Sequence, residues 1–140
     1  MEKLLEEFKK ICQKNGIKVT PQRIAIYQEL LKADDHPSAV VVYERIKKRF
    51  PNISLDTVNR TLLLFAELGL ARIIEGHGDP KRFDPNTKPH HHFRCLKCGK
   101  IFDFYHEPYD ELHVPEEISS RFKILYKRVN LEGFCENCRN

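Results

Sequence analysis

Hydrophobic side chains in residues 1–70 recur every three or four positions, which is the spacing of one buried face of an α-helix. Gly16 and Pro51 stop two of these runs, and Thr20-Pro21 opens another in the way a capped helix begins. The predicted helices are one ending near Gly16, one starting at Thr20-Pro21, one from Ser38 to Phe50, and one from Ser54 to about Leu68. Cys12 lies on the apolar stripe of the first helix, so we expect it in the core.

The pattern changes to short strands after Gly69. Ala71 to Glu75 and Arg82 to Asp84 are predicted strands around the turn formed by residues 76–80. Short helices followed by a two-stranded hairpin are typical of a winged helix-turn-helix domain. We therefore expect a winged helix over residues 1–84.

Residues 85–89 have the composition of a hinge, and the segment 90–140 that follows is different in character. We expect strands around Phe93 and residues 101–105, a helix from Pro108 to Phe122, and a strand from Ile124 to Leu131. The fold class is therefore α+β, with a small C-terminal α/β domain. Its core would be thin, and domains of this size often need a metal ion or a partner subunit.

Four of the five cysteines form two C-x-x-C pairs, Cys95 with Cys98 and Cys135 with Cys138. Each pair places two thiolates on a tight turn, where both can reach one tetrahedral ion. The 36 residues between the pairs do not argue against a shared site, because loop closure costs only about 0.6 kcal/mol per doubling of length. We predict a structural zinc on the four cysteines, with redox-active pairs as the alternative.

A second cluster of metal-binding residue types precedes the first cysteine pair. His90 and His92 alternate with His91, so on a strand they share one face while His91 points to the other. Asp84 and Asp103 are close enough along the chain to fold back towards them. We predict that this cluster binds metal, the alternative being surface histidines. His77, His106 and His113 have no ligand spacing, and we expect them to be exposed and uninvolved.

The net charge of +4 lies entirely in residues 1–88, which hold 16 Lys and Arg against 12 Asp and Glu. A basic N-terminal part favours phosphate binding, although a solvated mixed-charge surface would give the same balance.

No segment has the roughly 18 apolar residues that a membrane span needs. Residues 1–10 lack the apolar core of a signal peptide. We expect a cytoplasmic protein with no membrane partner.

Five motifs in order resemble the ferric uptake regulator (Fur) family, and together they span nearly the whole chain. They are GIKVTPQR at residues 16–23, HPSA at 36–39, FPNISLDTV at 50–58, RFD at 82–84, and H-x-H-x-x-C-x-x-C-G at 90–99. The resemblance implies a winged-helix DNA-binding domain joined to a dimerisation domain. It also implies a homodimer that, when loaded with metal, binds palindromic operator DNA and represses transcription.

Within that family the chain is most similar to the peroxide-sensing, PerR-like branch, in which three histidines and two aspartates hold a regulatory Fe(II) or Mn(II). Matching the motifs residue by residue places those ligands at His36, Asp84, His90, His92 and Asp103. The resemblance further implies that peroxide oxidises a ligand histidine, His36 or His90, and releases metal and DNA.

Three alternatives stay open at this point. One is a regulator of iron, manganese or zinc uptake without peroxide chemistry. This chain has Lys127 at a position where the iron-sensing branch commonly has a histidine. The zinc-sensing branch often has a cysteine in the regulatory site, and no such cysteine lies near the histidine and aspartate cluster of this chain. Another is a metal-dependent hydrolase, although the chain has no evident nucleophile, so we do not expect an enzyme. The last is a zinc-stabilised interaction module.

The predicted DNA contacts lie mainly in the first turns of the fourth helix, the part that usually reaches base edges. Family members usually carry Tyr where this chain has Asn59, and an Asn can hydrogen-bond bidentately to an adenine edge. The expected contacts are Ser54, Thr57, Asn59 and Arg60 on that helix, with Lys18 and Arg23 on the backbone or in the minor groove.

Overall fold

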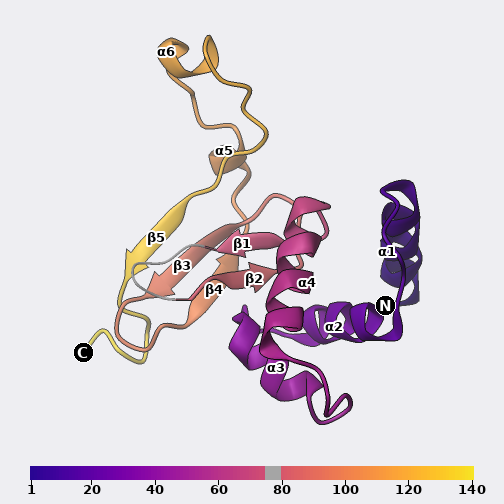
Figure 1. Ribbon diagram of the computed structural model, residues 1–140. Helices are drawn as coiled ribbons and strands as arrows, with labels where there is room; N and C mark the ends of the chain where they lie inside the picture. The colour runs from indigo at the N-terminus through magenta and orange to yellow at the C-terminus, as the bar shows by residue number, and fades with distance from the viewer. Residues whose placement is uncertain (75–79) are drawn as a thin grey trace. The chain divides into compact units, whose positions relative to one another are not determined.

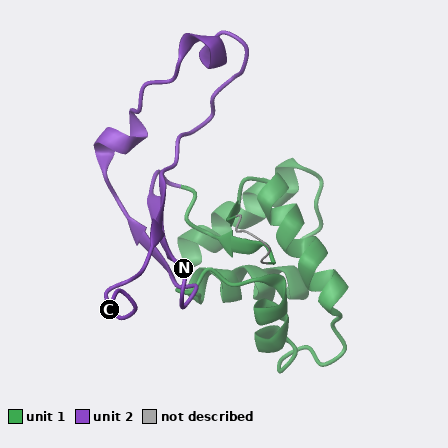
Figure 2. Cartoon of the chain, turned by 90° about the vertical axis from the view of Figure 1, so that its left-hand side faces the viewer, with its two compact units in different colours: residues 1–87 green, residues 88–140 purple. Residues whose placement is uncertain are grey.

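The computed structural model describes residues 1–74 and 80–140, and in it the chain forms two compact units. The first unit is Met1–Thr87 and the second is Lys88–Asn140 (Figure 2). The first is mostly helical and the second is built around a sheet, so the chain has the mixed α+β class that the sequence predicts. Among the described residues, no helix is long and apolar enough to cross a membrane.

The first unit consists of four helices followed by a two-stranded antiparallel sheet (Figure 1). Its elements are α1 (Glu2–Lys14), α2 (Pro21–Lys32), α3 (Ala39–Ile46), α4 (Leu55–Glu67), β1 (Arg72–Ile74) and β2 (Arg82–Asp84). Residues 75–79 of the expected hairpin, which include His77, lie outside the described residues.

The starts of three helices follow from capping side chains. The hydroxyl oxygen of Thr20 accepts a hydrogen bond from the Arg23 backbone N–H, and Ser54 accepts one from Thr57 in the same way. Ser38 likewise accepts from the Val41 backbone N–H at the start of α3. Each cap satisfies an N–H group that the first helical turn leaves without a partner.

The third helix is shorter than the sequence predicts, because it ends at Ile46 and not at Phe50. Residues 47–49 form turns, and the Arg49 N–H bonds to the carbonyl of Ile46 three residues earlier. Pro51 disfavours helical backbone at the residue before it, so the chain leaves the helix ahead of that position.

Aromatic rings at the centre of the first unit join α1, α2 and α4. Phe8 stacks on Tyr27 with 4.7 Å between ring centroids, and Phe65 meets both rings edge-on at 5.5 and 5.6 Å. Cys12 is fully buried in the same cluster, which confirms that it is a core residue. This core holds together the helices that present α4.

The second unit is a three-stranded sheet in the order β4-β3-β5. Strand β3 (His91–Cys95) pairs antiparallel with β4 (Ile101–Phe104) and parallel with β5 (Asn130–Gly133). Two short helical turns, α5 (Glu107–Asp110) and α6 (Glu116–Ser119), lie in the long connection between β4 and β5.

Two predictions for the second unit are wrong. The single helix expected from Pro108 to Phe122 is two short turns, because Pro115 lacks an N–H group and stands between them at the start of α6. The last strand begins at Asn130 and not at Ile124, since its pairing with β3 starts where Asn130 lies opposite His92.

Candidate metal centres and a candidate DNA-binding face

The four paired cysteines lie together at one end of the sheet in the second unit. Cys95 ends β3, Cys98 follows in a turn, and Cys135 and Cys138 come directly after β5. One Sγ atom from each lies within 4.8 Å of the others, and no disulfide joins them. Four thiolates at this spacing are the ligand set of a closed, tetrahedral zinc site.

Sheet register explains why cysteines so far apart in sequence meet. Cys95 lies opposite Gly133 in the parallel β3–β5 pair, and the Leu96 N–H donates to the Gly133 carbonyl at 2.8 Å. The chain therefore places Cys135 two residues beyond a paired position. Gly99, with a φ of 76°, allows the first cysteine turn to reverse, which a residue with a side chain would strain.

Backbone N–H groups favour the charged form of one thiol. The N–H groups of Cys98 and Cys135 donate to the Cys95 sulfur at 3.5 and 3.4 Å, and these bonds lower the pKa of Cys95 to about 6. The hydrogen bond with Cys135 instead raises the pKa of Cys138 to about 12. A group of thiols that cannot all ionise by themselves is stabilised as thiolates by a bound cation, so the donor set fits zinc.

A second group of donors lies further along the same sheet. His92 stands opposite Asp103 in the β3–β4 pair, and its Nε2 lies 3.1 Å from the Asp103 carboxylate. The Nε2 of His90 lies 3.9 Å from the same carboxylate, and the two imidazole rings meet edge-on at 4.7 Å. The structure thus brings together three of the five predicted regulatory ligands within one unit.

The hydrogen bonding of His90 defines which nitrogen faces Asp103. Its Nδ1 lies 2.7 Å from the Lys88 carbonyl oxygen, which can only accept, so the proton is on Nδ1. The lone pair is then on Nε2, the atom on the Asp103 side. A histidine that ligates a metal typically uses its second N–H in this manner.

The other two predicted ligands lie together in the first unit. His36 Nε2 is 3.9 Å from an Asp84 carboxylate oxygen, and both side chains are buried. The second Asp84 oxygen accepts a hydrogen bond from the Asn86 N–H at 2.9 Å. The five donors are all nitrogen or oxygen, which suits a divalent ion such as Fe(II) or Mn(II) better than a sulfur-rich set would.

His91 has a partner that the sequence did not reveal. It is fully buried, its Nε2 donates to the Asp110 carboxylate at 2.7 Å, and its Nδ1 accepts from the Val129 N–H at 3.0 Å. The expectation that His91 points away from its two neighbours agrees with these contacts. These contacts join β3 to α5 and to the segment before β5. The sequence indicated only that His91 faces away from His90 and His92.

His106 and His113 are exposed, as expected, although the His106 ring packs edge-on against Tyr109 at 4.6 Å. In the described part of the chain, the groups of candidate metal ligands include neither residue.

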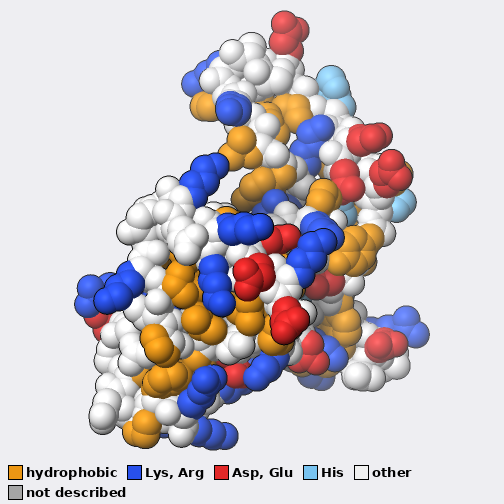
Figure 3. All heavy atoms as spheres, turned by 90° about the vertical axis from the view of Figure 1, so that its right-hand side faces the viewer, with side chains coloured by type: hydrophobic (Ala, Val, Ile, Leu, Met, Phe, Trp, Pro, Cys, Tyr) orange, Lys and Arg blue, Asp and Glu red, His pale blue; other side chains and the backbone are white. Residues whose placement is uncertain are grey.

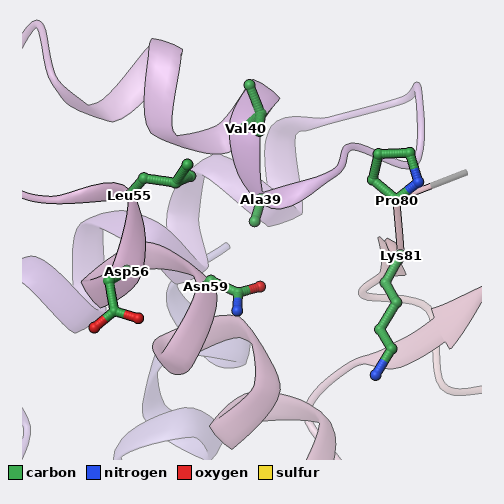
Figure 4. Close-up of a pocket in the computed structure, with 7 residues that line it drawn as sticks. All are labelled: Ala39, Val40, Leu55, Asp56, Asn59, Pro80 and Lys81. Atoms are coloured by element: carbon green, nitrogen blue, oxygen red, sulfur yellow. The ribbon is translucent and has the colours of Figure 1, made fainter.

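Helix α4 is flanked by two hollows lined by predicted DNA contacts. One, of about 440 Å³, lies among α3, α4 and the residues just before β2 (Figure 4). The Asn59 amide turns towards it, whereas the Asp56 carboxylate points away. The second, of about 390 Å³, is lined by Arg23, Thr57 and Arg60.

Some of the predicted DNA contacts already have partners in the chain. Arg60 pairs with Asp56 at 2.8 Å on the exposed side of α4, and Arg23 donates to the Lys18 carbonyl at 2.6 Å. The hydroxyl of Ser54 caps α4 and donates to Thr57. An exposed ion pair such as Arg60–Asp56 contributes little stability, so Arg60 can exchange it for a phosphate or base.

Replacing a paired cysteine tests the zinc assignment. We expect Cys135→Ser to lose the zinc and the folded structure of the second unit, because few apolar side chains are buried there. Zinc content by atomic emission, with near-ultraviolet circular dichroism, measures both effects. Cys12→Ala is the matched control and should keep full zinc. Equal zinc content in the two variants would exclude the four-cysteine site.

Comparisons with known proteins agree in placing the chain. The profile of the Ferric uptake regulator family matches residues 14–132. The peroxide-responsive repressor PerR of Staphylococcus epidermidis is 35% identical over 135 residues, which cover 96% of this chain and 90% of that protein.

Two solved structures share the fold. The ferric uptake regulator Fur of Helicobacter pylori aligns with a TM-score of 0.77 and 23% identity, over 99% of this chain and 93% of that one. PerR from Streptococcus pyogenes aligns with a TM-score of 0.55 and 26% identity, over 95% and 91% of the two chains. A family match over most of the chain and a relative of this similarity lead to one conclusion. The chain belongs to the ferric uptake regulator family.

Proposed function

We propose that this protein is a cytoplasmic, metal-dependent transcriptional repressor that binds operator DNA as a homodimer and releases it after peroxide oxidises a ligand histidine. The main support for the proposal is that the candidate metal ligands fall into groups of different chemistry. One group is four thiols, and the others are histidines and aspartates without sulfur. Structural zinc on Cys95, Cys98, Cys135 and Cys138 would leave the histidines and aspartates for a regulatory ion.

One regulatory ion would be held by His36, Asp84, His90, His92 and Asp103. The first unit supplies two of these donors and the second supplies three. Neither set alone completes the coordination of a divalent transition metal. An ion that takes both sets joins the units, and its occupancy then governs how the two DNA-binding units of a dimer are spaced. A near-complete shift of such an equilibrium needs about 5.5 kcal/mol of preference, within reach of five ligands.

The second unit supports the homodimer. Between residues 112 and 134 it exposes a series of large hydrophobic side chains, with exposed fractions from 40% for Ile124 to 75% for Leu125. Figure 3 shows hydrophobic side chains among charged ones on the face that it draws. Exposed apolar surface of this kind marks a protein interface, and a second copy would bury it.

The DNA-binding face is proposed on the exposed side of α4. Asn59 would read a base edge, and Arg60 and Arg23 would contact phosphates or bases, with Lys18, Ser54 and Thr57 completing the surface. Lys81 lines the same hollow as Asn59 and extends the basic surface towards the hairpin (Figure 4).

Peroxide sensing is the proposed branch within the family. Fe(II) at the regulatory site would supply the reactivity towards peroxide. The reaction adds one oxygen atom of peroxide to the imidazole of His36 or His90, and the other leaves as water. The altered ring is a poorer ligand, so the five-donor site is lost. The alternative is an uptake regulator for iron, manganese or zinc, which would use the same ligands without this oxidation. The matched relatives are regulators, and we propose no catalytic activity.

Removing the first-unit histidine tests the metal switch. We expect His36→Ala to lose most of the gain in operator affinity that Mn(II) gives the wild type, because the ion can no longer bind both units. The variant should keep its zinc. Fluorescence anisotropy with a labelled operator, with and without Mn(II), measures the gain. His106→Ala is the control and should respond like the wild type. An unchanged response in His36→Ala would rule out the proposed switch.

Mass spectrometry tests the peroxide reaction. After loading with Fe(II) and treatment with peroxide, we expect peptides containing His36 or His90 to gain the mass of one oxygen atom, in parallel with loss of operator binding. Protein loaded with Mn(II) is the matched sample. Unmodified histidines together with retained DNA binding would favour the uptake regulator over the peroxide sensor.

Replacing Asn59 tests the reading face. We expect Asn59→Ala to weaken binding to an operator selected from random duplexes by about 1–3 kcal/mol, because a bidentate contact to one base is lost. Its preference at that base pair should disappear, which repeated selection with the variant would reveal. Glu67→Gln at the far end of α4 serves as the control. An unaltered sequence preference in Asn59→Ala would place the reading residue elsewhere.

A further inference from the structure

The segment that carries His36 has a strained backbone. His36 has a φ of 49°, and among the described residues it is the only one other than glycine with a positive φ. A residue with a β-carbon adopts this region at a cost, because the β-carbon crowds the neighbouring carbonyl. Such a conformation persists only where surrounding contacts impose it.

Arg82 makes the contacts that impose it. Its Nε donates to the His36 carbonyl at 2.7 Å, and a terminal guanidinium nitrogen donates to the Asp35 carbonyl at 2.6 Å. A single planar guanidinium thereby holds two successive carbonyl groups. Arginine suits this task because its donors lie in a rigid fork, whereas a lysine has one rotating ammonium group.

Other contacts fix the same segment along β2. The Phe83 N–H donates to the Pro37 carbonyl at 3.0 Å, and the backbones of Ser38 and Arg82 form an isolated antiparallel β-bridge. The side chain of Asp35 is held as well, because Arg45 donates to both oxygens of its carboxylate, at 2.6 and 3.3 Å. The pKa of Asp35 is lowered, chiefly by the Arg45 hydrogen bond, which keeps that carboxylate ionised.

Strand β2 therefore acts on both donors of the first unit. Arg82 and Asp84 are two residues apart and share one face of the strand. Asp84 supplies a carboxylate 3.9 Å from the His36 imidazole, and Arg82 holds the backbone on which that imidazole is mounted. The distance between the two donors depends on the backbone turn at residues 35 and 36.

We propose that Arg82 is a positioning residue for the regulatory metal, because it holds the His36 turn so that His36 and Asp84 are prearranged as one half of the site. The inference rests on the proposed function, since it assumes that His36 binds the ion. Arg82 reaches His36 through the backbone carbonyl of that residue. We therefore expect its effect on metal affinity to pass through His36.

A double-mutant cycle tests this route. Mn(II) affinity is measured by isothermal titration on the zinc-loaded full chain. We expect Arg82→Gln to bind Mn(II) at least about 10-fold more weakly than the wild type, as is typical when a group that orients a ligand is removed. Arg82→Lys should fall between the two. His36→Ala with Arg82→Gln should bind no more weakly than His36→Ala alone, because the two changes remove the same contribution.

A merely structural role would give a different result. The losses in the double variant would then add, and the thermal unfolding midpoint of the metal-free chain would fall with the affinity. Arg49→Gln, whose guanidinium lies over the Phe50 ring on the surface, is the matched control and should bind Mn(II) normally. If Arg82→Gln does not fold, the cycle is run with Arg82→Lys, which keeps the charge but not the fork.

The outcomes separate this inference from the proposed function. Wild-type affinity in the Arg82 variants, or additive losses in the cycle, would overturn the positioning role while leaving the repressor intact. A wild-type chain without a Mn(II)-dependent gain in operator binding would instead defeat the proposed function, and the inference with it.

Discussion

The main constraint on the second unit is that its two cysteine pairs gather at one end of a sheet that has almost no apolar core. The buried hydrophobic residues of this unit are Cys95, Ile101 and Cys135, and two of these three are themselves thiols of the cluster. Three short strands with so small a core cannot offset the entropy of ordering the chain by burial alone. A metal ion bound by all four thiols would supply that missing stability, and it would do so where the parallel strands β3 and β5 end.

The first unit follows a different principle, because its stability comes from packing and its metal donors lie at the edge of that packing. The packed rings of Phe8, Tyr27 and Phe65 give α4 a rigid base. Strand β2 packs Phe83 into this core. Asp84 at the end of the strand lies beside His36, Arg82 at its start holds the His36 backbone, and Lys81 just before it lines the Asn59 hollow. Groups proposed to bind metal and DNA thus belong to one short strand and its immediate neighbours.

Local signals in the sequence predicted much of this arrangement. The caps at Thr20, Ser38 and Ser54 identified three helix starts, because each is a short-range hydrogen bond that residue type decides. Strand alternation correctly separated His91 from His90 and His92. The two cysteine pairs could be predicted to form one cluster, because two C-x-x-C pairs in one short segment are typical of a shared metal site.

Features set by distant contacts could not be predicted. The start of β5 depends on its register with β3, and the residues before it are apolar enough to look like a strand. The bonds from Arg82 to residues 35 and 36 span more than forty positions, and nothing in the local sequence indicates a positive φ at His36. The partnership of His91 with Asp110 is likewise a product of tertiary folding.

Strand β3 has a consequence for the order in which metals enter. It carries His92 and Cys95 three residues apart, and His90 precedes it directly. A slip of one residue in its pairing would turn every side chain to the opposite face, so that His91 would replace its neighbours opposite Asp103. Under the proposed function, zinc held at Cys95 would fix that register. Metal loading would then be hierarchical, and scarcity of zinc would prevent the regulatory ion from binding.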